Sequence, residues 1–337
     1  MSGETAPQQP LSTDENPEWY SRCCTDLSKV NPSGGRIDGM KAILTRASWM
    51  WDNGRTITVG FVNPVPGTPV QQAKVQEVVK EWEKYANLKF RFIPNGNDAE
   101  IRVSFQLDYG SWSYVGNTAL QIAKPERTMN FGWVYPTPEL TDPERGVILH
   151  EFGHAIGYMH EHQSPRRGEK LTLNEPVIID YCKRTQIPPW PEAKTRANII
   201  NVYSRAEVSN FSVVDFTSIM MYFMPANWNV QGIEIPPNNR LSPLDKAYAF
   251  LNYPFFIGTA SSDPDVNILN ALNGAGVTGP SRASIALEYI ENDWKGLRAE
   301  FTRWAVNQRA LSDRAQAVTE REEAAAAVAA VAEVEAD

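Results

Sequence analysis

The chain has 337 residues, of which 42% are hydrophobic and 21% are charged, and these are ordinary values for a globular protein. Its formal net charge of -8 at pH 7 argues against a nucleic-acid partner, because phosphate binding needs concentrated Lys and Arg. The sequence also lacks an apolar run long enough to predict a membrane span.

Residues 1–46 are rich in Pro, Ser, Gly and Asn and show no periodicity. They are therefore predicted to form an extended or disordered leader. The first residues, M-S-G-E-T-A-P, lack the basic and apolar regions of a secretory signal. We therefore expect a cytoplasmic or unconventionally secreted protein.

From residue 56 onward the hydrophobic pattern predicts strands and helices. T-I-T-V-G-F-V at 56–62 alternates like a strand, and residues 73–85 repeat apolar side chains at the spacing of an amphipathic helix. Short alternating runs between 89 and 105 predict two more strands. Residues 118–123 and 128–134 follow as further strand candidates, and the first would be an edge strand that pairs with an extended peptide. The succession predicts an α+β fold with helices on a mixed sheet.

All four histidines fall within residues 150–162, in the run H-E-F-G-H-A-I-G-Y-M-H-E-H. His150 and His154 are one helical turn apart and therefore share one face of a helix. The same helix cannot easily supply a third ligand, but Gly157 permits a turn that brings His160 back. Three imidazoles and one open position are typical of a catalytic zinc site. We predict one Zn2+ held by these three histidines.

Glu151 follows the first predicted ligand and would point beside the metal-binding face. Zinc lowers the pKa of the water that it binds, so a neighbouring carboxylate can take the proton while a polarised carbonyl is attacked. The proton would then pass to a leaving amine. This arrangement predicts peptide-bond hydrolysis with Glu151 as the general base.

The segment S-I-M-M-Y at 218–222 has the methionine-containing turn that accompanies the extended zinc motif in metzincins. Together with the histidine run, it makes the region from Ala47 to Tyr253 resemble the astacin-like branch of the metzincin zinc endopeptidases. H-E-H-Q-S-P at 160–165 is closer to the microbial members than to the animal ones. G-S-W-S-Y-V-G at 110–116 is similar to the stretch before the substrate-binding edge strand. The resemblance implies a zincin fold in which a twisted mixed sheet, an active-site helix and a C-terminal subdomain are combined.

The resemblance also implies roles for individual residues of this chain. Met220 matches the turn methionine, and Tyr222 matches the tyrosine that binds zinc and swings aside to hold the transition state; core packing is the alternative for both. Glu161 corresponds to a glutamate that pairs with a freed amino terminus in processed astacins, and a loop carboxylate is the alternative. Met221 stands where animal astacins have histidine, and their two disulfides are missing.

The composition changes after Tyr253. Residues 256–280 are predicted to be a linker with a short helix that ends at Gly274, and residues 281–337 a helical extension with an Ala- and Glu-rich tail. Apolar residues from 287 to 304 recur at steps of three and four, which predicts a packing seam. The seam would dock on the preceding domain or pair with another copy. The predicted domains are the leader 1–46, the peptidase-like domain 47–255, the linker 256–280 and the extension 281–337.

The sequence therefore predicts a zinc-dependent metalloendopeptidase that cleaves protein substrates bound in extended form. The alternatives are a catalytically silent, zinc-bound peptide-recognition module and an oligomerising scaffold built on residues 287–304. Cys23 and Cys24 are either ordinary thiols or the source of a thiolate that keeps the enzyme latent. The aromatic residues expected to line substrate pockets or to pack in the core are Trp112, Tyr114 and Trp133.

Overall fold

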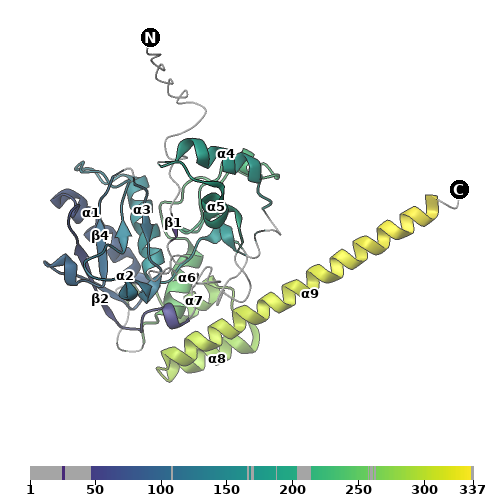
Figure 1. Ribbon diagram of the computed structural model, residues 1–337. Helices are drawn as coiled ribbons and strands as arrows, with labels where there is room; N and C mark the ends of the chain where they lie inside the picture. Colours follow the sequence, from purple (N-terminus) through teal and green to yellow (C-terminus); the bar gives the residue numbers. More distant parts are fainter. Residues whose placement is uncertain are drawn as a thin grey trace, which may run out of the picture.

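Figure 1 shows the computed structural model, which describes residues 25–26, 47–107, 109–164, 167, 171–186, 188–202, 214–256, 258, 261 and 263–334. The strands are β1 (Thr25–Asp26), β2 (Thr56–Phe61), β3 (Lys89–Phe92), β4 (Ile101–Ser104), β5 (Trp112–Ser113) and β6 (Met129–Asn130). The α-helices are α1 (Pro69–Val78), α2 (Trp82–Tyr85), α3 (Asp142–Ala155), α4 (Glu175–Thr185), α5 (Glu192–Thr195), α6 (Pro243–Asn252), α7 (Ile268–Gly274), α8 (Gly279–Ile290) and α9 (Trp294–Val334). Short helices of other types are η2 (Ala47–Trp49), η3 (Val79–Glu81), η4 (Gly96–Asp98), η5 (Gly116–Gln121), η6 (Glu161–Gln163), the π-helix η8 (Arg196–Ile200) and η9 (Ala226–Trp228).

The described strands form one mixed sheet in the order β1-β5-β6-β4-β2-β3. Strand β2 is parallel to β3 and β4, β6 is parallel to β4, and β5 alone runs antiparallel to its neighbour β6. Ile57 and Val59 of β2 are fully buried, as the predicted alternation requires. The predicted α+β fold with a mixed sheet is therefore confirmed.

The edge strand predicted at 118–123 is wrong. The chain enters the 3-10 helix η5 at Gly116, where φ is +56° and a Cβ atom would lie 1.9 Å from the carbonyl oxygen of Trp49. The Thr118 hydroxyl donates to the Val115 carbonyl at 2.6 Å, which stabilises a turn rather than a strand. The strand at this edge of the described sheet is instead β1, which pairs with β5 in parallel register.

Helix starts follow signals that are visible in the sequence. Helices α1, α3 and α6 each begin with a capping box, in which the N-cap hydroxyl and the side chain three residues later bond each other's backbone N–H. Each also has proline in the first two helical positions, where the missing N–H costs nothing. These caps fix where the helix that carries the histidines begins.

The described side chains form two hydrophobic clusters. The larger one packs the sheet against α1, α2, α3 and α6 and continues into α7, α8 and α9. The smaller one lies around α4, the π-helix η8 and the segment 221–235. The turn at 218–222 joins them, because Met220 belongs to the larger cluster while Met221 and Tyr222 belong to the smaller one.

The predicted seam over 287–304 is divided between two helices. The break comes at Asn292, where φ is +59°. The residues of the seam on α9 that face the body are fully or almost fully buried, whereas Leu287 and Ile290 of α8 are 53% and 63% exposed. Arg298 donates to the Asn252 and Trp51 carbonyls and so ties α9 to the body. The buried residues of this seam are Leu297, Phe301 and Trp304.

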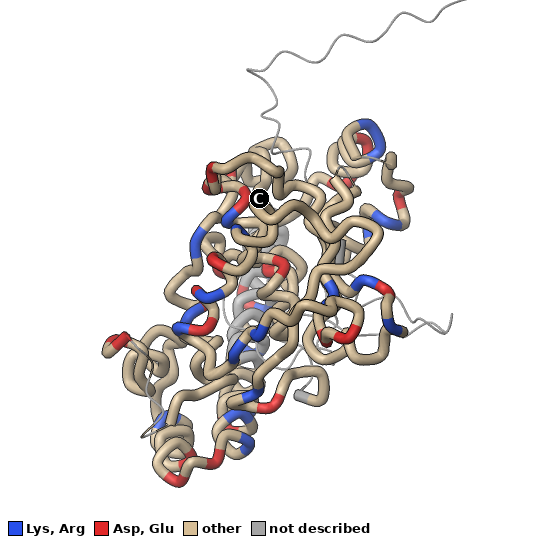
Figure 2. The backbone as a smooth tube through the Cα atoms, turned by 90° about the vertical axis from the view of Figure 1, so that its left-hand side faces the viewer, with Lys and Arg blue, Asp and Glu red and all other residues tan. Residues whose placement is uncertain are grey.

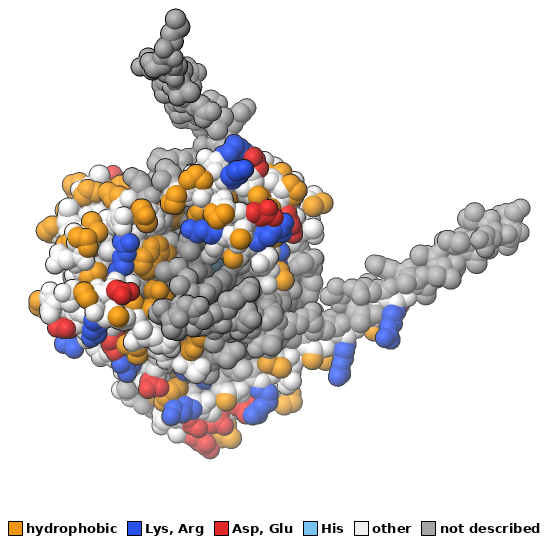
Figure 3. Space-filling model, viewed as in Figure 1, with side chains coloured by type: hydrophobic (Ala, Val, Ile, Leu, Met, Phe, Trp, Pro, Cys, Tyr) orange, Lys and Arg blue, Asp and Glu red, His pale blue; other side chains and the backbone are white. Residues whose placement is uncertain are grey.

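Beyond this contact, α9 extends away from the body (Figure 1), and Lys and Arg side chains are visible on the stretch nearest to it (Figure 3). In the described part of the chain, no helix combines the length and the apolar character that crossing a membrane requires. Acidic and basic residues alternate along the described backbone in the view of Figure 2, with no large region of one sign. Pairing of a second copy through residues 287–304 stays a prediction, as do the bounds of the four predicted domains.

Candidate metal centre and active site

Three histidines converge at the end of α3. His150 and His154 lie on one face of this helix, which ends at Ala155. Gly157 adopts a positive φ of 107°, and its N–H and that of Tyr158 bond back to the last turn of α3. The reversal places His160 against the first two rings, so that one nitrogen atom of each ring lies within 4.8 Å of the others.

Hydrogen bonds at the outer nitrogens orient the three rings. His150 Nδ1 lies 2.8 Å from the Ile219 carbonyl oxygen, and His154 Nδ1 lies 2.8 Å from that of Tyr158. A carbonyl oxygen can only accept, so each Nδ1 carries the proton and each Nε2 keeps a lone pair. His160 Nδ1 lies 3.4 Å from Gln163 Oε1. Such bonds to the second ring nitrogen fix the tautomer that a metal ion needs.

The arrangement fits a metal ion on the chemistry of its donors. Burial, together with the neighbouring His154, lowers the pKa of His150 to about 3, although the hydrogen bond to Ile219 opposes this shift. The imidazole is therefore neutral at pH 7. Its Nε2 atom is buried and has no hydrogen-bond partner among the described residues. The Nε2 atoms of His154 and His160 are only 3.1 Å apart, and a cation between two such lone pairs would stabilise them.

The methionine turn at 218–222 packs against the helix that carries His150 and His154. Met220 is 1% exposed, and a Cβ atom at Gly153 of α3 would lie 2.6 Å from its sulfur atom. The glycine therefore allows the methionine to pack directly under the helix turn that carries the ligands. The Met220 carbonyl also accepts a bond from the Glu161 N–H at 3.0 Å, which ties the turn to the segment after the third histidine.

Tyr222 lies beside the predicted ligands and is 5% exposed. Its ring centroid lies 4.7 Å from that of His160 and 6.2 Å from that of His150. Glu151, which is 1% exposed, lines the same cavity as Tyr222 and His150. The two predicted catalytic side chains therefore lie at one site.

Other predicted residues are distributed differently. Trp133 lines the cavity beside the histidines, whereas Trp112 and Tyr114 line a separate one near Arg127. Glu161 is buried and accepts the Asp215 N–H at 2.9 Å. Its pairing with a freed amino terminus stays a prediction. Cys23 and Cys24 lie outside the described residues.

Sequence reasoning gave no role to His162. Its buried ring packs against that of Tyr222 in a tilted arrangement at a centroid distance of 4.1 Å, and its Nε2 lies 3.0 Å from the Asn198 carbonyl of the π-helix. π-Helical turns are frequent at functional sites. The sequence H-E-H at 160–162 was the available signal that His162 belongs to the site. Its partner Asn198, however, is 36 residues away in the sequence.

Asp245 was also missed, although the capping box S-P-L-D at 242–245 marks it in the sequence. Its carboxylate accepts bonds from Ser218 Oγ at 2.7 Å and from the Ile219 N–H at 2.8 Å. The carbonyl of the same residue, Ile219, orients His150. Burial raises the pKa of Asp245 to about 6, although these hydrogen bonds oppose the shift.

A mixed sheet, a helix with two histidines and a third histidine after a glycine turn define a zincin-type metalloprotein. The sequence profile of the peptidase family described as Astacin matches residues 45–233. The chain belongs to this astacin family of peptidases. The predicted resemblance to astacin-like metzincins is thereby confirmed.

Individual relatives agree with this assignment. The structure of myroilysin is 34% identical to this chain with a TM-score of 0.57, over 64% of this chain and 99% of that one. Serralysin from Proteus mirabilis is 24% identical over 58% of this chain, and tolloid-like protein 2 from Mus musculus is 24% identical over 54%. The matches span 42% of that serralysin and 15% of that tolloid-like protein, so the chain corresponds to less than half of either relative.

Proposed function

We propose that the protein is a zinc-dependent metalloendopeptidase that cleaves peptide bonds in protein substrates. The observation that supports this most is the convergence of three buried imidazoles beside a buried glutamate, in a member of a peptidase family. His150, His154 and His160 would hold one Zn2+. Three nitrogen ligands leave room for water and substrate, which structural zinc sites do not.

When bound, zinc would supply Lewis acidity, lowering the pKa of water and polarising the scissile carbonyl. Glu151 would accept the proton from that water and deliver it to the leaving amine. Its burial excludes bulk solvent from this transfer. Tyr222, whose ring packs between His162 and His160, would donate a hydrogen bond from its hydroxyl to the oxygen that becomes negatively charged.

An extended substrate would be bound through backbone hydrogen bonds at the edge of the sheet, because such bonds do not depend on side-chain identity. Strand β5 supports this expectation, because it already pairs in this way with a short extended segment of the same chain, β1. A catalytically silent peptide-recognition module would need the edge of the sheet, but it would not need Glu151 beside the histidines.

The test is Glu151→Gln in the full chain, compared with Glu139→Gln at an exposed position outside the site. We expect Glu151→Gln to keep about one zinc per chain, measured by elemental analysis, and to lose roughly 100- to 10,000-fold in the cleavage rate of a denatured protein. Glu139→Gln should cleave like the wild type, and a chelator should stop cleavage by Glu139→Gln and by the wild type. Cleavage by Glu151→Gln at the wild-type rate would refute the proposed base.

A further inference from the structure

The side chain of Gln163 lies between the third predicted metal ligand and the π-helix η8. Gln163 is 0% exposed and ends η6, the short helix that follows His160. Its Oε1 atom lies 3.4 Å from His160 Nδ1. Its Nε2 atom lies 2.9 Å from the Ala197 carbonyl oxygen and 2.8 Å from that of Asn201. One amide group thus contacts a predicted ligand through its oxygen and the π-helix through its nitrogen.

The other two predicted ligands are oriented by the backbone. His150 and His154 donate from Nδ1 to backbone carbonyls at 2.8 Å, and a carbonyl can only accept. A glutamine amide has no such restriction, because a rotation of 180° exchanges its oxygen for its NH2 group. The NH2 group would make Nδ1 of His160 an acceptor and move the ring proton to Nε2. In that tautomer no lone pair is left at the nitrogen that lies 3.1 Å from His154 Nε2.

The π-helix decides between the two orientations of the amide. The carbonyl oxygens of Ala197 and Asn201 can only accept, so the NH2 group must face them and gives one N–H to each. The rotated amide would instead place its oxygen against two carbonyl oxygens in a fully buried position, where an unpaired polar group is costly. Oε1 of Gln163 therefore faces His160, and His160 carries its proton on Nδ1.

The carbonyls that orient Gln163 belong to a segment that is itself held in place. Arg167, which is 9% exposed, donates to the Ile199 and Ile200 carbonyls of the π-helix at 3.3 and 2.8 Å. Ala197 lies 34 residues after Gln163 in the sequence. The proton on His160 therefore depends on a contact between two segments that are distant along the chain.

We propose that Gln163 is a positioning residue for the metal site: the π-helix orients its amide, and the amide selects the tautomer of His160 that can bind a metal ion. The outer nitrogen of a ligand histidine commonly needs such a partner, and losing the partner costs about 10- to 100-fold in metal affinity or activity. The proposal rests on the proposed zinc-dependent function, and it concerns a residue that acts through His160.

The first test is Gln163→Met in the full chain, which keeps the length of the side chain but removes its acceptor and its donors. We expect this variant to bind zinc about 10- to 100-fold more weakly than the wild type, in competition with a chelator of known zinc affinity. Gln163→Glu keeps an acceptor for His160 but cannot donate to the π-helix when ionised. It should therefore retain at least the wild-type zinc affinity while its midpoint of urea unfolding falls. A purely structural role of Gln163 predicts instead that both variants lose zinc affinity.

Gln71→Met is the matched control. Gln71 is 4% exposed, and its Nε2 donates to the Val134 carbonyl at 2.6 Å. Its Oε1, however, accepts the Thr68 N–H at 2.9 Å rather than a histidine. This variant should lose stability in urea and keep the wild-type zinc affinity. Equal losses of zinc affinity in Gln71→Met and Gln163→Met would contradict the proposal.

The second test observes the tautomer directly, by nitrogen NMR of isotope-labelled histidine in the metal-free full chain. We expect the Nδ1–H form of His160 in the wild type and in Gln163→Glu, and a mixture with the Nε2–H form in Gln163→Met. The Nε2–H form in the wild type, or wild-type zinc affinity in Gln163→Met, would overturn the proposal while leaving the peptidase function intact. A wild-type chain that binds no zinc would instead refute the proposed function itself.

Discussion

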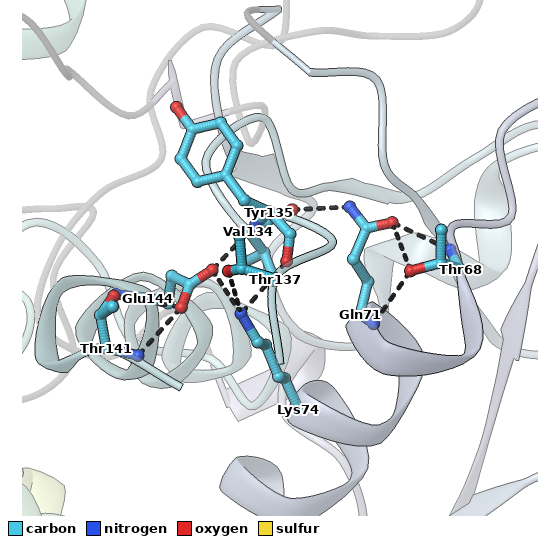
Figure 4. A network of polar contacts seen from close by, with 8 residues as sticks. All are labelled: Thr68, Gln71, Lys74, Val134, Tyr135, Thr137, Thr141 and Glu144. Atoms are coloured by element: carbon cyan, nitrogen blue, oxygen red, sulfur yellow. Dashed lines mark hydrogen bonds and ion pairs between the residues drawn. The ribbon is translucent and has the colours of Figure 1, made fainter. Parts of the chain in front are cut away.

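A buried ion pair joins the start of α3 to α1, and its removal should destabilise the protein in a pH-dependent way. Lys74 Nζ lies 2.7 Å from Glu144 Oε1, and both side chains are 4% exposed. The same carboxylate accepts the N–H groups of Thr141 and Tyr135, each at 2.9 Å (Figure 4). Glu144 thereby holds together α1, the loop before α3 and the first turn of the helix that carries the histidines.

The perturbation is Lys74→Met, which keeps most of the side-chain volume and removes the charge. It leaves Glu144 buried without its cation, and breaking one partner of such a pair costs about 3–5 kcal/mol of the free energy of unfolding. With a urea dependence of about 1–3 kcal/mol per molar, the midpoint of unfolding should fall by roughly 1 M or more. Lys89→Met is the matched control, because Lys89 is 60% exposed and its pair with Glu83 should contribute at most about 1 kcal/mol.

The pH dependence distinguishes a lost ion pair from lost packing. Burial raises the pKa of Glu144, but the bonds from Lys74, Thr141 and Tyr135 outweigh it and place the pKa below its ordinary value. In the wild type this group therefore contributes stability above the unfolded-state pKa, and the contribution is lost as the pH falls through the folded-state value. Without Lys74 the main opposing interaction is gone, so the pKa of Glu144 rises and the deficit of the variant grows with pH.

The assay is urea unfolding at pH 4.5 and pH 8, with chelator in every sample so that metal binding does not contribute to stability. The double variant Lys74→Met with Glu144→Gln removes both charges while keeping a side chain that can complete the capping box. It should recover a large part of the loss. A deficit of Lys74→Met that is the same at both pH values, or that the second substitution does not reduce, would refute the ion-pair argument.

Two further predictions concern residues next to the site. Replacing Asp245 by Asn mimics its protonated form. Because the pKa of Asp245 is raised to about 6, its stabilising contribution is present at low pH and is lost as the pH rises through about 6. In unfolding experiments the free energy of unfolding of the variant should therefore increase by up to about 3 kcal/mol relative to the wild type between pH 4 and pH 7. An unchanged difference across this range would show that Asp245 does not titrate there. Replacing His162 by Ala should lower kcat by up to about tenfold, the value of one aromatic contact, without changing zinc content, and His162→Phe should retain most of the rate because it keeps a ring against Tyr222. Loss of zinc from either variant, or equal rates for both, would contradict a role in positioning Tyr222.

The sequence was sufficient to predict those parts of the structure that depend only on residues close together along the chain. The spacing of His150 and His154 predicts their shared face, because helix geometry alone determines it. The turn at Gly157 is equally local, since it needs only a residue that tolerates positive φ. Strands β2, β3 and β4 followed from alternation in the sequence, although all four residues of β4 are buried. The predicted cluster of three histidines, although not its metal, could therefore be built from one short run of the sequence.

Prediction failed where contacts distant in sequence decide the outcome. Residues 118–123 have the alternation of a strand, but the close approach of Gly116 to Trp49 imposes a 3-10 turn there. The helix break before α9 did have a local signal, because Asp293 Oδ1 accepts the Lys295 N–H at 2.9 Å in the manner of an N-cap. The histidine run draws attention to His162 but does not predict its contact with Asn198, since that contact depends on how the π-helix packs.

Ile219 shows that the geometry of the predicted metal site depends on the packing of the fold. Its N–H is held by Asp245 of α6, 26 residues later, while its carbonyl orients His150 of α3, 69 residues earlier. The two peptide groups on either side of the Ile219 Cα thus connect α6 to the predicted metal ligand. Because that orientation exists only after α3, the methionine turn and α6 have packed together, a metal ion that needs it binds the folded chain alone. Binding must then stabilise all three segments together, as linkage requires.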